Sequence, residues 1–123
     1  MDTVGAVAID EDGRLAVANS TGGASPMMRG RVGDTAVIGA GFYVGEGAAL
    51  AATGKGEEIL RRMLAKTTYD LISAGAELSS ACERGIAAFP RAHPVGIIAI
   101  CPGGYVIKAN RRMASCALVK EAC

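Results

Sequence analysis

The chain has 123 residues, of which half are hydrophobic, and its 13 Lys and Arg residues nearly balance 12 Asp and Glu residues for a net charge of +1. This length fits one domain with a hydrophobic core, so residues 1–123 are expected to fold together. The basic and acidic residues are mixed along the chain, so nothing in the sequence indicates electrostatic binding to nucleic acid or to an acidic membrane. No apolar run reaches the roughly 18 residues of a membrane span. The first residues lack the basic segment of a signal peptide, so a cytoplasmic location is expected.

The residues that bind metals in proteins are not grouped in this sequence. A zinc site needs four clustered nitrogen or sulfur ligands, whereas the chain has one histidine, His93, and no cysteine falls in a CxxC motif. The segment Gly54-Lys55-Gly56 also lacks the spacing of a phosphate-binding loop. We therefore expect no metal and no cofactor. The cysteines are Cys82, Cys101, Cys116 and Cys123.

The sequence pattern in the first half of the chain predicts β-strands. Residues 3–10 and 14–19 are small, apolar runs joined by Asp12-Gly13, a pair typical of a hairpin turn. Residues 20–34 are rich in glycine and are expected to be irregular. Residues 36–44 and 48–52 are predicted as two further strands.

From Glu57 onward, the apolar residues change to helical spacing. The pattern at Ile59, Leu60, Met63 and Leu64 predicts one helix that continues to Gly75. Glu57 and Glu58 lie in its first turn, where carboxylates favour the positive end of the helix.

A second helix is predicted from Ser80, where Ser80 and Glu83 have capping-box spacing, to a point before Pro90. Residues 95–101 and 105–109 are predicted as a final pair of strands, and the tail 111–123 as a short helix. Strands followed by helices and then strands indicate an α+β fold, with antiparallel strands and helices packed on one face of the sheet.

The residues that can carry chemistry are threonines beside glycines and one Arg/Asp pair. Read singly, each is ordinary: a turn threonine, a surface ion pair or a helix cap. They occur in this order in five segments: Asp2-Thr3-Val4-Gly5, Ser20-Thr21-Gly22-Gly23, Gly30-Arg31-Val32-Gly33-Asp34, Gly39-Ala40-Gly41 and Thr53-Gly54-Lys55-Gly56-Glu57. The order and spacing of these segments together resemble the catalytic β subunit of plant-type L-asparaginase/isoaspartyl peptidase, a threonine-type N-terminal-nucleophile hydrolase. The similarity is dense over residues 2–60 and weak after about residue 105.

The resemblance implies a role for each residue of the candidate site. Thr3 would be the nucleophile, exposed by self-cleavage of the Asp2–Thr3 bond, and Thr21 would assist its activation. The Thr53 hydroxyl and the Gly54 N–H would stabilise the oxyanion. In the substrate-binding part, Arg31 would bind the α-carboxylate, Asp34 the α-ammonium group, and Gly54 and Gly56 would add backbone contacts.

Elementary chemistry agrees with the role of Thr3. A threonine hydroxyl is a weak nucleophile without a base. A free terminal amine has a pKa of about 7.7–8.0 and can act as that base near neutral pH. Because Met1 and Asp2 precede Thr3, this amine exists only after cleavage.

The resemblance also implies an assembly and a substrate class. The fold would be half of an αββα sandwich, completed by an α subunit that is not present in this chain and by a second αβ unit in a heterotetramer. The substrate would be L-asparagine or a β-aspartyl (isoaspartyl) dipeptide. Two alternatives stay open: a glycosylasparaginase, since Asp2 before the nucleophile resembles that branch, or an unprocessed β-subunit fragment with only a binding role.

Overall fold

A computed structural model describes residues 2–120, and they begin with an antiparallel hairpin. Strand β1 (Thr3–Ile9) pairs with β2 (Leu15–Thr21), with Ile9 opposite Leu15 and Thr3 opposite Thr21. The Asp10 carboxylate accepts hydrogen bonds from the backbone N–H groups of Asp12 and Arg14 and so shapes the turn. The predicted hairpin is confirmed.

A second sheet has four antiparallel strands in the order β3-β4-β5-β6. These are β3 (Phe42–Val44), β4 (Ala49–Gly54), β5 (Val95–Cys101) and β6 (Gly104–Ala109). Strand β4 ends two residues later than predicted, so Thr53 and Gly54 belong to the sheet and pair with β5.

The prediction of one strand over residues 36–44 is wrong. A short 3-10 helix, η1 (Asp34–Ala36), comes first, and only the last three residues join the sheet. The Asp34 carbonyl accepts the N–H groups of Val37 and Gly41, which bends the chain back. Gly39, with a φ of 91°, allows this bend because it has no side chain.

The single predicted helix from Glu57 to Gly75 is two helices. Helix α1 (Gly56–Arg62) ends and α2 (Leu64–Ser73) begins at Met63, whose φ of 47° is left-handed. The N–H groups of Ala65 and Lys66 donate to the carbonyls of Ala40 and Gly39. The break is therefore stabilised by a distant loop that accepts hydrogen bonds from the first turn of α2.

Helix α3 (Leu78–Ala87) begins two residues before the predicted Ser80. Its N-cap is Glu77, whose carboxylate accepts the N–H groups of Ser79 and Ser80. The predicted helix in the tail is also wrong over residues 111–120, which have no regular secondary structure. The rest of that prediction and Cys123 lie outside the described residues.

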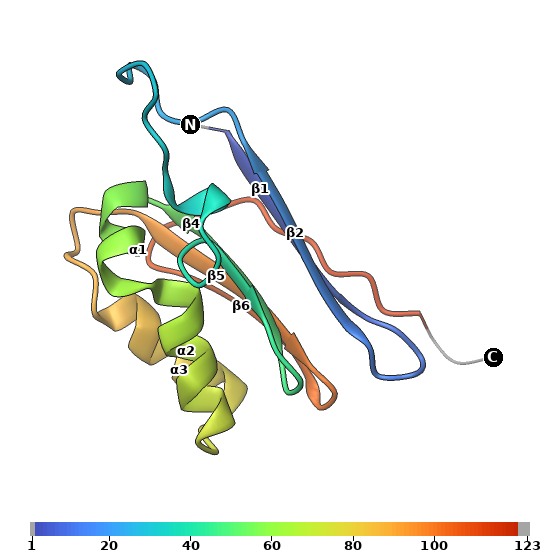
Figure 1. The fold of residues 1–123 in the computed structure, drawn as a ribbon. Coiled ribbons are helices and arrows are strands. Elements are labelled where there is room, and N and C mark those ends of the chain that lie inside the picture. Colours follow the sequence, from blue (N-terminus) through green and yellow to red (C-terminus); the bar gives the residue numbers. More distant parts are fainter. Residues whose placement is uncertain (1, 121–123) are drawn as a thin grey trace.

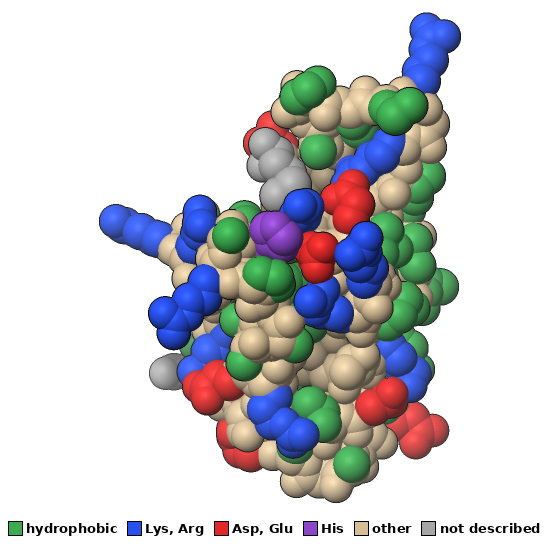
Figure 2. Space-filling view, turned by 90° about the vertical axis from the view of Figure 1, so that its left-hand side faces the viewer, with side chains coloured by type: hydrophobic (Ala, Val, Ile, Leu, Met, Phe, Trp, Pro, Cys, Tyr) green, Lys and Arg blue, Asp and Glu red, His purple; other side chains and the backbone are tan. Residues whose placement is uncertain are grey.

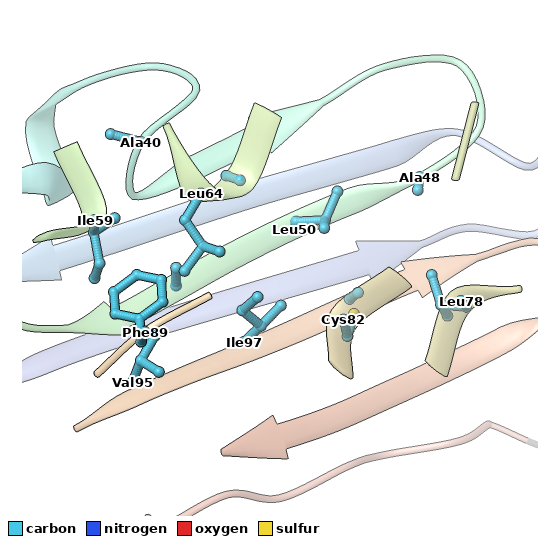
Figure 3. Packing of buried hydrophobic residues seen from close by; sticks show 13 residues of the cluster. Ala40, Ala48, Leu50, Ile59, Leu64, Leu78, Cys82, Phe89, Val95 and Ile97 are labelled. Carbon is cyan, nitrogen blue, oxygen red and sulfur yellow. The ribbon is translucent and has the colours of Figure 1, made fainter. Parts of the chain in front are cut away.

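The elements form three layers (Figure 1). The helices cover one face of the four-stranded sheet, and the hairpin lies against the other. The core lies between helices and sheet, where Leu50, Leu64 and Ile97 are almost fully buried (Figure 3). This α+β arrangement agrees with the predicted class and fits half of an αββα sandwich. Among residues 2–120, no helix is long and apolar enough to span a membrane.

Close packing joins the hairpin to the sheet. A Cβ atom on Gly5 would lie only 2.9 Å from the Ala51 Cβ, so β1 and β4 approach each other at this point. The two strands run in opposite directions, which brings the start of β1 and the end of β4 to the same end of the molecule (Figure 1).

Candidate active site

Thr3 and Thr21 lie opposite each other at the open end of the hairpin. Their Oγ1 atoms are 2.8 Å apart, a hydrogen-bond distance. The two residues are far apart in sequence, and the strand register alone brings them together. The structure thus places the predicted nucleophile beside the predicted assisting hydroxyl.

The carbonyl of Asp2, at the predicted cleavage bond, belongs to the same network. Its oxygen accepts hydrogen bonds from the Thr21 hydroxyl at 3.2 Å and from the Gly22 N–H at 3.1 Å. Because the single Thr21 hydroxyl proton points to this carbonyl, the Thr3 hydroxyl is the donor in the pair. The Gly23 N–H also donates to Thr21 Oγ1, at 3.0 Å, and holds that side chain in place.

Thr53 is the next-to-last residue of β4, and its side chain lies on the face of the sheet that meets the hairpin. Side chains alternate along a strand, so Thr53 shares a face with Ala51, which meets Gly5 of the hairpin. By the same alternation, Thr3 points from β1 toward the sheet. Both threonine side chains therefore point into the space between the two layers, at the same end.

Gly54 follows Thr53 in a conformation that requires glycine. Its φ is 149°, and a Cβ there would lie 2.3 Å from the carbonyl oxygen of Pro94 and 2.9 Å from the Cα of Val95. The same Pro94 oxygen accepts the N–H of Lys55 at 3.2 Å. The segment before β5 thus fixes the backbone at the predicted oxyanion site.

Asn110 holds that segment, and the sequence assigns it no role. Its Oδ1 accepts the Val95 N–H at 2.9 Å, and its Nδ2 donates to the His93 carbonyl at 2.8 Å. Asn110 follows the last strand, and its partners precede the neighbouring strand β5. No local pattern reveals such a pairing, because it depends on strand order.

Arg31 lies between two glycines and binds a carboxylate. A Cβ on Gly33 would be 2.8 Å from Nη1, and one on Gly56 would be 2.8 Å from Nη2, so side chains at these positions would crowd the guanidinium. Glu57 Oε1 accepts from Arg31 Nε at 3.1 Å and from Nη2 at 2.8 Å. The sequence explained Glu57 only as a first-turn acid and missed this contact.

Asp34 is a buried carboxylate beside the same glycine. It is 6% exposed, and its Oδ2 has no hydrogen-bond partner among the described residues. A Cβ on Gly56 would lie 2.9 Å from its Oδ1. Burial raises the pKa of Asp34 above its ordinary value of 3.8, and the nearby Arg31 charge only partly opposes this rise. A buried acceptor with an unused oxygen suits a cationic ligand.

The site residues thus form two groups. Asp2, Thr3 and Thr21 are joined by hydrogen bonds, whereas Arg31, Asp34 and Gly56 meet at the start of α1. Figure 2 shows a mixed acidic and basic surface around the single histidine, His93, whose Nε2 is 3.3 Å from Lys55 Nζ.

The layered antiparallel α+β fold fits one half of an N-terminal-nucleophile hydrolase. A family model described as Asparaginase matches residues 1–122. The chain therefore belongs to the plant-type L-asparaginase/isoaspartyl peptidase family.

Individual relatives agree with this assignment. The chain is 45% identical to the plant-type L-asparaginase of Pyrobaculum calidifontis over 69% of its length. It is 46% identical over 68% of its length to the isoaspartyl peptidase of Escherichia coli, and 38% identical over 98% to the isoaspartyl peptidase/L-asparaginase of Xenopus laevis. It spans only 29%, 27% and 40% of these relatives, respectively.

Proposed function

We propose that this chain is the catalytic β subunit of a threonine amidohydrolase that cleaves the side-chain amide of L-asparagine or of β-aspartyl dipeptides. The observation that carries the proposal is the network at the start of β1. There, the hydroxyl of Thr3 is 2.8 Å from that of Thr21, which also donates to the carbonyl of the Asp2–Thr3 bond. The relatives that match the chain are named for these two activities.

The same network supports self-cleavage before Thr3. In this step Thr3 Oγ1 forms a bond to the Asp2 carbonyl carbon, and the hydroxyl of Thr21 and the N–H of Gly22 stabilise the negative oxygen. The C–N bond then breaks, and the hydroxyl proton passes to the Thr3 nitrogen. Water hydrolyses the resulting ester, which regenerates the Thr3 hydroxyl beside a free amine.

The free amine then serves as the base for turnover. It takes the proton of the Thr3 hydroxyl, whose oxygen attacks the substrate amide carbon; the amide C–N bond breaks, and the proton passes to the departing ammonia or amine. Water then hydrolyses the ester between Thr3 and the aspartyl group, which releases the acid and restores the Thr3 hydroxyl. The Thr53 hydroxyl and the Gly54 N–H are assigned to the substrate oxyanion. Both residues lie at the end of β4, and the Thr53 side chain shares the face of Ala51, which packs against the hairpin.

Arg31 and Asp34 are assigned to the two charged groups of the substrate. A planar guanidinium binds a carboxylate with two parallel hydrogen bonds, which suits Arg31 and the α-carboxylate. Asp34 has a buried, unpaired Oδ2 that suits the α-ammonium group, and Gly56 leaves room between the two side chains. L-asparagine and β-aspartyl dipeptides share both groups, so this arrangement does not separate them.

An α subunit is the partner that we propose for the outer face of the hairpin. Val4 is 69% exposed there, and the other outward residues of the two strands are small, exposed and uncharged: Ala6, Ala8, Ala16, Ala18 and Ser20. An apolar face of this kind suits burial by another protein layer. The assembly proposed is two α and two β subunits in the cytoplasm.

The test is a mass spectrum of the full-length protein that carries this chain, combined with an activity assay. We expect a fragment that begins at Thr3, and release of ammonia from L-asparagine or of the second amino acid from a β-aspartyl dipeptide. Thr3→Ala should remain uncleaved and inactive. Ser20→Ala is the control, because Ser20 lies beside Thr21 in β2 but on the outer face. An intact Asp2–Thr3 bond in an active protein would refute the proposal.

A further inference from the structure

Glu57 binds one edge of the Arg31 guanidinium and leaves the other free. Its Oε1 accepts from Nε and Nη2, which lie on the side edge of the group. The end edge, formed by Nη1 and Nη2, keeps N–H groups that point away from Glu57. Gly33 and Gly56 flank these two nitrogens, where any Cβ would come within 2.8 Å. The free edge is the one that can bind a carboxylate with two hydrogen bonds.

Arg31 is paired with Glu57 and not with the neighbouring acid Asp34. Arg31 Nη2 and Asp34 Oδ1 approach the same point beside Gly56, at 2.8 and 2.9 Å from the position of an added Cβ. Arg31 nevertheless forms its ion pair with Glu57, and Oδ2 of Asp34 has no partner among the described residues. Among the described residues, Arg31 has no ion pair with Asp34, so its end edge stays free of that carboxylate.

We propose that Glu57 is a positioning residue, which orients the end edge of Arg31 toward the substrate α-carboxylate. This inference rests on the proposed function. The Arg31 hydrogen bond holds the pKa of Glu57 below its ordinary value of 4.5, so Glu57 stays ionised at neutral pH. Glu57 acts only through Arg31, and its effect is therefore on binding.

The test compares two amides in Glu57→Ala, Glu57→Gln and wild-type protein in the active full-length assembly. L-asparagine has the α-carboxylate, whereas L-asparaginamide has a neutral amide in its place. For Glu57→Ala we expect KM for L-asparagine to rise about tenfold or more, the loss of one charge-assisted contact. KM for L-asparaginamide and both kcat values should change less than about threefold. Glu57→Gln keeps an oxygen acceptor and should recover part of the loss.

Glu58→Ala is the matched control. Glu58 is the next residue of α1, and its ion pairs are with Arg61 and Arg62 instead of Arg31. It should leave the preference between the two amides unchanged. If Glu57→Ala weakens both amides equally, Glu57 supports only the local fold and the inference is wrong; unchanged KM values overturn it as well.

A separate outcome concerns the proposed function. If the wild-type protein hydrolyses neither amide, that proposal fails, and titration calorimetry with L-aspartate decides the role of Glu57. A weaker Kd in Glu57→Ala but not in Glu58→Ala supports positioning of Arg31. Absence of L-aspartate binding to the wild-type protein overturns it.

Discussion

Replacing Thr21 by valine removes one hydroxyl from the cleavage network with almost no change in shape. The hydroxyl has three contacts: Thr3 Oγ1 at 2.8 Å, the Asp2 carbonyl at 3.2 Å and the Gly23 N–H at 3.0 Å. Valine keeps the β-branched side chain that favours a strand. Thr21 is exposed, so the free energy of unfolding should change by no more than about 1 kcal/mol.

The expected loss in cleavage rate follows from the donors to the Asp2 oxygen. Two donors stabilise that oxygen in the structure, and the valine variant keeps only the Gly22 N–H. Removing one oxyanion donor lowers a rate by about 10²–10³. The Thr21 contact of 3.2 Å is long for a bond between two oxygens, so we expect a fall of about 10².

The assay follows the intact precursor and the fragment that begins at Thr3 by mass spectrometry over time. Thr21→Ser keeps the hydroxyl and should cleave within about tenfold of the wild-type rate, which separates the hydroxyl from the methyl group. Thermal unfolding of each precursor checks that the fold is unchanged. Cleavage of Thr21→Val at the wild-type rate would show that this hydroxyl does not stabilise the scissile carbonyl.

Three further substitutions test the packing and charge of the site. Gly5→Ala should lower the free energy of unfolding by about 1–3 kcal/mol, because the added methyl group would lie 2.9 Å from the Ala51 Cβ. Urea unfolding measures this against Gly47→Ala, whose methyl group meets nothing within 4 Å, and equal effects would contradict the packing. In the same assay, Asn110→Ala should lower the free energy of unfolding by about 2 kcal/mol, because it leaves the partly buried N–H at the start of β5 unpaired. Asn110→Asp keeps an oxygen acceptor for this N–H and should lower the free energy of unfolding by about half as much. Burial raises the folded-state pKa of Asp34, which favours its protonated form, so the wild-type fold loses stability as pH rises through that pKa. Asp34→Asn should therefore have a higher melting temperature than wild type at about pH 7 and the same melting temperature at about pH 3. The variant should also lose affinity for aspartyl substrates. An equal difference in melting temperature at both pH values would show that the charge of Asp34 is not the cause.

Local sequence patterns predicted the elements whose partners are close in the chain. The hairpin follows from period-two apolar residues on either side of Asp12-Gly13, and its register then sets Thr3 opposite Thr21. The break between α1 and α2 was not predictable in this way, because apolar spacing continues through Met63. The carbonyls that stabilise the break belong to Gly39 and Ala40, far away in sequence.

The same distinction holds for the candidate site. Threonine, arginine and aspartate beside glycines could be selected from the sequence only as an ordered set, through its resemblance to the asparaginase family. Glu57 could not be selected in this way, since a carboxylate in the first turn of a helix already has a local explanation. Asn110 could not be selected either, since its partners are defined only when β5 and β6 pair. Sequence therefore identified groups proposed to touch the substrate, and missed those that hold them.

The two groups of site residues should be open to separate disturbance by substitution. The cleavage network belongs to the hairpin, whereas the Arg31 and Glu57 pair belongs to the loop before η1 and the start of α1. No hydrogen bond among the described residues links the two groups. Self-cleavage uses no α-carboxylate, so loss of Glu57 should leave maturation unchanged while it weakens substrate binding. A defect in one step with the other intact would therefore identify which group a substitution has disturbed.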